Sequence, residues 1–315
     1  MRIAAVAAAL SCVLALTGTI PAAAATDRQQ PCWQAWALVA QEGPGLAEND
    51  LSSWGRVNDG FLSLADSTFD GPLSNAFGDV SAAAEVVTLA LQSDSAGGPP
   101  RTEFDAALGA LGTVCAQLSV TKHGLKVPRF QKFAYQTGTL TGLSPAAGAR
   151  ANATIAQRVG RAVRAARRAN ATACMGGAAT CGYFIQSLKK GPCIPGLVCV
   201  RSQIGILPVG ANDGQGFVTT MPFDALTGRI VPLSRVVPST AAFIVGVNAA
   251  VRAALAAGGL AVDPYWAPHV KTKDVRAWLP QPDGIHVWFD KYAVAPGSFG
   301  IVHVVVPWPA GDSSA

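Results

Sequence analysis

The histidines are the first candidates for chemistry, because a neutral imidazole can bind a metal ion or take up a proton near neutral pH. The chain has four of them, His123, His269, His286 and His303. His286 and His303 lie on the last two predicted strands and could face each other across that pair. The pair could bind a metal or act as a base, although most strand histidines are surface or half-buried residues. No His-x-x-x-His or His-Glu-x-x-His spacing occurs, so we expect no bound metal and no zinc hydrolase.

A serine hydrolase would need a nucleophile held on a sharp turn beside a base. No Gly-x-Ser-x-Gly motif is present, and Ser298, within Pro296-Gly-Ser-Phe-Gly300, is the nearest approach to one. That segment is more simply interpreted as a turn. Ser298, His286 and His303 are therefore only a weak alternative catalytic set. We expect a protein that is not an enzyme and needs no cofactor, and a secreted hydrolase of wall or lipid esters is the alternative.

Tryptophans gather towards the C-terminus, where exposed indole rings could stack on sugars or anchor a partner protein. Trp266 and Trp278 flank a predicted loop that starts at His269. We expect both rings to be exposed and take these three residues as candidate binding residues. The alternative is that the tryptophans fill a core.

Arginines recur every three or four residues on a predicted helix over residues 146–169, which places Arg158, Arg161 and Arg164 on one face. This basic face could contact an anionic cell-wall polymer, or it could simply be solvated. Nucleic acid is a third possible ligand, but an exported protein rarely meets it. We therefore expect no nucleic-acid partner.

The first 25 residues have the pattern of a secretory signal, with Arg2, an apolar stretch over residues 3–16 and small residues before the expected cleavage near Ala24 or Ala25. We expect a secreted chain, extracellular or associated with the cell wall, and no later segment that is long and apolar enough to cross a bilayer. The 315 residues are 50% hydrophobic and carry a net charge of +5. This length suffices for two domains, and the charge weakly favours acidic partners.

Cys12 lies inside the signal, which leaves six cysteines in the exported chain. An even number of cysteines in an exported protein indicates disulfides. No Cys-x-x-Cys pair occurs, which argues against the alternative of a metal site. Among the many possible connectivities we predict Cys32–Cys115, Cys174–Cys181 and Cys193–Cys199.

The chain divides into two parts. Residues 26–121 have a helical pattern, and four short helices there suggest a small antiparallel bundle, closed by the first predicted disulfide. A basic stretch with glycine and proline, residues 122–129, is the expected joint. Residues 128–310 mix strands with helices, and one helix should begin after Ser239 and end at Gly258. The strands predicted in this second part cover residues 130–136, 182–188, 197–206, 217–223, 285–289 and 301–306.

Two motifs suggest a family. A strand runs into the turn Asp224-Ala-Leu-Thr-Gly228, which is followed by Leu233 and by the helix that contains Phe243. Further on come, in order, Asp283-Gly284, Phe289, Tyr292, Ala295-Pro296, Gly300 and Pro307-Trp308. In these features residues 128–310 resemble the C-terminal domain of RsiV-type proteins, which is also found in secreted immunogenic proteins of mycobacteria. We recognise no relative of the N-terminal helical part.

The resemblance implies an α+β protein in which a β-grasp-like mixed sheet-and-helix domain follows the small helical bundle. In RsiV-type proteins the extracellular domain is a lysozyme receptor, tethered by a membrane helix to a cytoplasmic segment. Here a cleavable signal and a helical bundle replace that segment, so an anti-sigma role is not expected. We therefore expect a secreted, non-enzymatic protein that binds a protein partner, such as a lysozyme, or a cell-wall partner.

Overall fold

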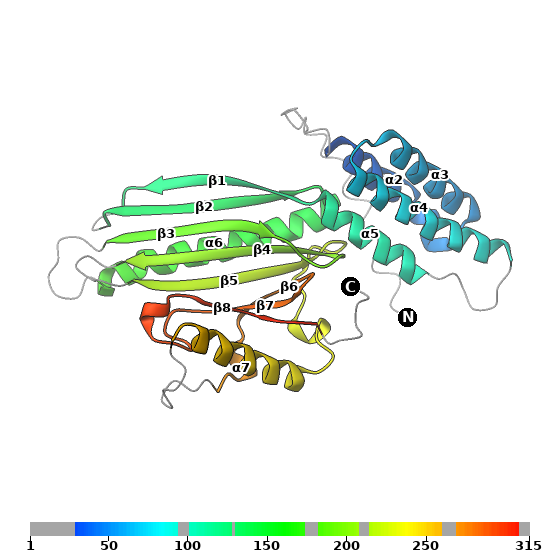
Figure 1. Cartoon of the computed structure of the whole chain (residues 1–315). Helices are drawn as coiled ribbons and strands as arrows, with labels where there is room; N and C mark the ends of the chain where they lie inside the picture. The colour runs from blue at the N-terminus through cyan, green and yellow to red at the C-terminus, as the bar shows by residue number, and fades with distance from the viewer. Residues whose placement is uncertain are drawn as a thin grey trace.

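The protein has a helical part and a larger part built of sheets and helices (Figure 1). The computed structural model describes residues 29–93, 101–127, 130–173, 182–207, 214–259 and 269–308. Four helices lie at one end of a five-stranded sheet, and a three-stranded sheet with its own helix lies beside the last strand. The predicted α+β class, with a helical region before a mixed sheet-and-helix domain, is confirmed.

The helical part surrounds one apolar core. Its helices are α2 (Gln29–Glu48), α3 (Leu51–Ser67), α4 (Gly71–Gln92) and α5 (Arg101–Cys115). The largest buried side chains of this core are Trp54, Phe61, Phe77, Leu73 and Leu111. The predicted disulfide Cys32–Cys115 is confirmed and joins the first turn of α2 to the end of α5. Such a long closed loop stabilises the fold by about 4 kcal/mol on the loop-entropy model.

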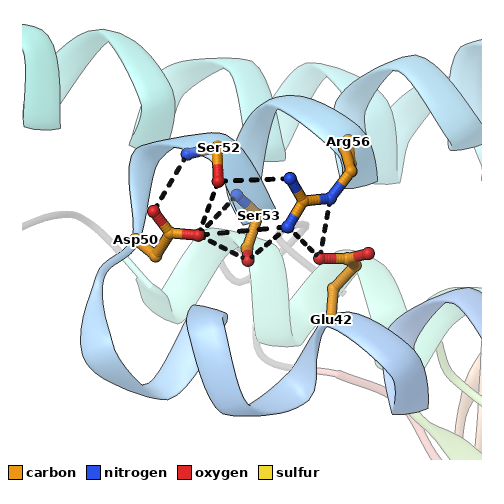
Figure 2. Close-up of polar contacts among 5 residues, drawn as sticks. All are labelled: Glu42, Asp50, Ser52, Ser53 and Arg56. Atoms are coloured by element: carbon orange, nitrogen blue, oxygen red, sulfur yellow. Dashed lines mark hydrogen bonds and ion pairs between the residues drawn. The ribbon is translucent and has the colours of Figure 1, made fainter.

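A polar network fixes the start of α3 against α2 (Figure 2). Asp50 is the N-cap of α3, and its carboxylate accepts hydrogen bonds from Ser52 and Ser53, which lower its pKa to about 2. The buried carboxylate of Glu42 accepts a hydrogen bond from Arg56 at 2.8 Å, and this contact lowers the pKa of Glu42. The network explains a buried acid in α2 without any need for a ligand.

The large sheet has the order β1-β2-β3-β4-β5. Its strands are β1 (Gln117–Leu125), β2 (Lys132–Thr141), β3 (Tyr183–Gly191), β4 (Leu197–Leu207) and β5 (Gln215–Asp224). Only β2 and β3 are parallel, and helix α6 (Pro145–Ala173) connects them across one face of the sheet. The buried stripe of α6 consists of Ala147, Ala151, Ile155, Val159, Val163 and Ala166.

Strands β2 and β3 separate after three residue pairs, and amide side chains fill the seam between them. The backbone N–H of Gln136 donates to the side chain of Gln186, and that of Leu188 donates to the side chain of Gln136. Farther along, Asn152 of α6 bonds both the N–H and the C=O of Leu140. These side chains replace the hydrogen bonds that the strands no longer give each other.

Contacts from later and earlier segments cover the outer edge of β5. The side chain of Asp290 accepts from Val218 N–H at 2.9 Å, and Lys291 N–H donates to the carbonyl of Gly216 at 3.0 Å. Arg158 of α6 donates to the carbonyl of Thr220 at 3.1 Å. At the end of the strand Pro222 O accepts from Val231 N–H, and Asp224 N–H donates to Arg229 O. An unpaired strand edge is a template for association, and these contacts block it.

The small sheet has the order β6-β7-β8, with strands β6 (Ala277–Gln281), β7 (Gly284–Phe289) and β8 (Val302–Val306). One of its faces packs on α7 (Thr240–Ala257) and the other on β4 and β5. As predicted, Ser239 caps α7 and Gly258 ends it. We expected no later segment long and apolar enough to cross a bilayer. This expectation was wrong, because the 18 residues of α7 are long enough and apolar enough to do so by length and composition. In the structure its buried side chains, Phe243, Val247, Val251 and Leu255, form the core with the small sheet.

We expected a basic joint over residues 122–129, but β1 occupies Gln117–Leu125 and pairs with β2 along its whole length. Leu118 continues the apolar spacing of Leu111 and Cys115, so helical periodicity did not reveal that α5 ends at Cys115. The disulfide Cys193–Cys199 is confirmed, while the predicted Cys174–Cys181 lies outside the described residues.

Candidate functional site

The hairpin of β7 and β8 places two histidines on one face of the small sheet. His303 lies opposite Trp288, and His286 lies two residues before Trp288 on the same strand. The turn into β7 requires Gly284, whose φ of 147° is unfavourable for other residues, and a Cβ there would overlap the carbonyl of Val306. This turn places Asp283 beside His286.

The three side chains form a continuous hydrogen-bonded chain. His286 Nε2 lies 2.8 Å from Asp283 Oδ1, and His286 Nδ1 lies 2.9 Å from His303 Nε2. The carboxylate can only accept, so His286 carries a proton on Nε2 and, when neutral, accepts on Nδ1. His303 then donates from Nε2, which leaves the lone pair of its Nδ1 available. The arrangement can hold and transfer a proton.

The surroundings favour a neutral His303. Packing against neighbouring side chains removes part of the solvent around the exposed His303 and lowers its pKa, nearby His286 and Arg201 lower it further, and Asp283 opposes them. The hydrogen bond from His286 lowers the pKa of Asp283. His303 stacks on Trp288 with ring centroids 4.7 Å apart, and the guanidinium of Arg201 lies 5.1 Å from the Trp288 ring. The two outer members of this hydrogen-bonded row, Asp283 and His303, are both exposed to solvent.

The structure therefore brings together two of the three candidate catalytic residues. Ser298 is exposed on a separate 3-10 turn and, within the described residues, has no hydrogen bond to either histidine. In the part of the chain that the structure describes, no three or more histidine, cysteine or acidic side chains, Asp283, His286 and His303 included, are arranged so that they could hold a metal ion together. Sequence reasoning missed Asp283 as part of this site. The signal was its spacing of three residues from His286 across a tight turn.

The candidate binding residues have different environments. Trp278 was expected to be exposed, but it is 8% exposed and packs in the core beneath α7, because both faces of β6 are covered. His269 is exposed, and Trp266 lies outside the described residues. Arg161 and Arg164 are exposed on α6. Burial lowers the pKa of Arg158, whose guanidinium bonds the edge of β5.

The helical part joins the sheet through α5. Gly112 permits this close approach, since a Cβ there would lie 2.8 Å from the Cβ of Ala225. Thr113 Oγ1 donates to Leu197 O at 3.0 Å, and Lys190 of β3 donates to the carbonyl of Ala116 just beyond α5. Trp36 of α2 donates from Nε1 to the carbonyl of Gly142 at 2.8 Å. The two parts are therefore held together by direct contacts.

A groove of about 780 Å³ lies along this junction. Its walls are α5, the loop before β4, the turn after β5, residues 231–238 and Trp308. Most of the lining side chains are apolar, including Ala106, Ile194, Pro195, Leu226, Val236 and Pro238. This volume is within the range of ligand sites in proteins, which often lie between domains. Sequence reasoning missed the groove because its walls come from five distant segments.

The groove has few charged groups. Asp224 is engaged within its own turn, where it accepts from the N–H groups of Leu226 and Thr227, and its other oxygen lies 3.6 Å from Arg235. Asp105 is exposed, but neighbouring groups remove part of its solvent and raise the pKa of its carboxyl, and Arg101 partly opposes this. The groove thus has a mostly apolar lining, a carboxylate on α5 and a guanidinium already paired with another carboxylate.

Comparisons with known proteins identify similarity to part of the chain. A family model described as a protein of unknown function (DUF3298) matches residues 259–309, which contain β6, β7, β8 and the histidine chain. No curated protein matches the chain. Similar solved structures include a DUF3298 family protein from Pseudomonas aeruginosa PAO1, at 15% identity and TM-score 0.44, covering 63% of this chain and 92% of that one. Another is a DUF3298 family member from Bacteroides fragilis NCTC 9343, at 10% identity and TM-score 0.38, covering 61% and 91%.

Proposed function

We propose that the protein is a secreted, non-enzymatic binding protein that holds a segment of a protein partner in the groove between α5 and the sheet domain. The observation that carries this proposal is the groove itself, about 780 Å³ in volume and lined mainly by apolar side chains from both parts. The signal-like N-terminus and the two disulfides of the described residues are consistent with an extracellular location.

The charges of the groove favour a protein segment over an anionic wall polymer. A polyanion would meet the carboxylates of Asp105 and Asp224, and Arg235, whose guanidinium is the only one that lines the groove within the described residues, already pairs with Asp224. An apolar segment that carries a basic side chain would bury its apolar groups and bring its charge towards Asp105. The resemblance to RsiV-type extracellular domains makes a lysozyme the first partner to test.

The test uses a substitution that fills the groove without disturbing a core. Ala106 is exposed on α5 and lines the groove, so Ala106→Trp should occlude it. Ala82, exposed on α4 outside the groove, provides the matched control Ala82→Trp. Binding to immobilised lysozyme, and to proteins of the culture filtrate, is measured by biolayer interferometry. We expect at least a tenfold loss of affinity for Ala106→Trp alone. Equal binding by both folded variants would refute the proposal.

A second candidate function rests on the chain Asp283–His286–His303. His303 is exposed, and its Nδ1, which makes no hydrogen bond within the described residues, could act as a general base that activates water against an ester, which is the hydrolase alternative. A panel of wall and lipid esters tests it with the variants His303→Ala and Ser298→Ala. Turnover lost in His303→Ala would support this function, and no turnover by the wild-type protein would exclude those substrates.

A further inference from the structure

The large sheet has a second edge at β1, and its backbone groups can be assigned from their neighbours. Gln136 and Leu140 of β2 direct their N–H groups towards β3, where side chains accept them. The even-numbered residues of β2 therefore face β3, and the odd-numbered ones bond to β1. The register pairs odd residues of β1 with odd residues of β2, for example Thr121 with Thr137. The even residues of β1 thus point their N–H and C=O groups outward.

These outward groups belong to Leu118, Val120, Lys122 and Gly124. Within the described parts of the chain, no backbone or side-chain group bonds to them. The strand is also open to solvent in its middle, since residues 119–122 are all exposed and Val120 retains 39% of its surface, while Leu118 is half-buried. Alternating donors and acceptors at strand spacing are complementary to another extended polypeptide backbone.

We propose that β1 pairs in antiparallel orientation with β1 of a second copy of this chain, around a twofold axis at Thr121. In this register Leu118 pairs with the partner's Gly124, and Val120 pairs with the partner's Lys122. All four outward residues of each copy are then paired. Thr121 faces the partner's Thr121, and Ser119 faces the partner's His123. The two five-stranded sheets become one continuous sheet.

The choice of a second copy rests on the self-complementarity of this strand. Moving the axis to Lys122 would place two lysines opposite each other, which is unfavourable. Moving it to Val120 would leave Gly124 unpaired. Only the axis at Thr121 pairs all the outward groups and keeps like charges apart. A twofold contact of this kind closes on itself and ends assembly at a dimer.

A cysteine at the axis tests the register. Towards the partner, Thr121 occupies a non-hydrogen-bonded position, where opposite Cα atoms lie about 4.5 Å apart, within the span of a disulfide. After folding and mild oxidation, Thr121→Cys should give mainly covalent dimer on a non-reducing gel. The matched control Ser119→Cys, which faces a histidine, should give at least tenfold less. Equal cross-linking of the two variants, or none with Thr121→Cys, would overturn the proposal.

A proline on the same edge tests the dimer without a new thiol. Val120→Pro removes one outward N–H but no bond to β2, and edge positions tolerate proline. Sedimentation velocity of the full chain over a concentration series should show a wild-type dimer and at least tenfold weaker association for Val120→Pro. A wild-type protein that stays monomeric, or a variant that dimerises equally, would contradict the proposal. A monomer that pairs instead with an added foreign strand would also contradict it.

Discussion

The two edges of the large sheet differ in how their backbone groups are satisfied. Along β5, Asp290, Lys291, Arg158, Val231 and Arg229 bond outward backbone groups. Along β1, the described residues place nothing against the outward groups of a nine-residue strand. The small sheet packs beside β5, the covered edge. Among the described residues, the open edge, β1, contacts the helical part only where the strand begins, at Gln117. The comparison indicates that earlier and later segments of the chain satisfy the β5 edge, while the β1 edge can still pair with another strand.

The strongest test of this difference is a pair of matched prolines. Val218→Pro removes an N–H that donates to Asp290 and disturbs a buried side chain, so it should lower the free energy of unfolding by about 2–4 kcal/mol. Val120→Pro, also at an outward position, should cost less than about 1 kcal/mol. Urea unfolding at dilute, monomeric concentration measures both. Similar losses in the two variants would show that the edges do not differ.

The carboxylate that covers β5 can be removed by itself. Asp290→Ala leaves the N–H of Val218 without its acceptor and should lower the free energy of unfolding by about 2 kcal/mol. Asp290→Asn retains an acceptor oxygen and should lose less than about 1 kcal/mol. Thermal and urea unfolding of both variants check this order. If Ala and Asn are equally tolerated, Asp290 does not stabilise this edge.

Arg158 gives a smaller effect on the same edge. Arg158→Ala removes the donor to Thr220 O and should cost about 1 kcal/mol. Arg161→Ala, at an exposed position on the same helix, should stay within about 0.5 kcal/mol of the wild type. The same two variants can be tested for binding to wall polymers. A larger effect of Arg161 on stability would be inconsistent with this assignment.

Of these predictions, the smallest effect is a loss of folding stability in acid, which arises from His303 on the β7–β8 hairpin. The pKa of His303 is lowered in the folded protein, so the unfolded chain binds more protons between that value and 6.5, and stability falls as the pH drops through this window. His303→Gln removes this dependence. Melting temperatures between pH 7 and pH 5 should therefore fall less in the variant than in the wild type. If the melting temperatures of the wild type and the variant fell equally with pH, His303 would not contribute to the pH dependence of stability.

Local patterns predicted much of the fold. The cap at Ser239, the end of α7 at Gly258 and strands β4 and β5 follow from short-range signals. The even cysteine count indicated disulfides but fixed no connectivity, and Cys32–Cys115 was one hypothesis among many possible pairings, which the structure confirms. Strand β1 did not, because its exposed residues have no apolar alternation and its pairing is set by β2. Trp278 was misjudged because β6 is covered on both faces.

The sequence predicted the candidate sites only where local patterns place the residues close together, and missed the parts that depend on tertiary packing. His286 and His303 lie on predicted neighbouring strands, so their approach could be expected, and the structure shows them 2.9 Å apart. The role of Asp283 depends on the turn at Gly284, which spacing alone does not specify. The groove depends on how α5 packs on the sheet through Gly112, a contact between residues more than a hundred positions apart.

The seam between β2 and β3 has a consequence for how the protein moves. The amides of Gln136, Leu140 and Leu188 are held by single side chains rather than by a neighbouring strand. Rotation of one side chain can expose such an amide to solvent while every strand stays in place, so its deuterium uptake should be faster than that of β4 amides. The hydrogen bonds that open most easily in this sheet would then lie between β2 and β3, inside the sheet, whereas fraying is usually expected at its edge strands.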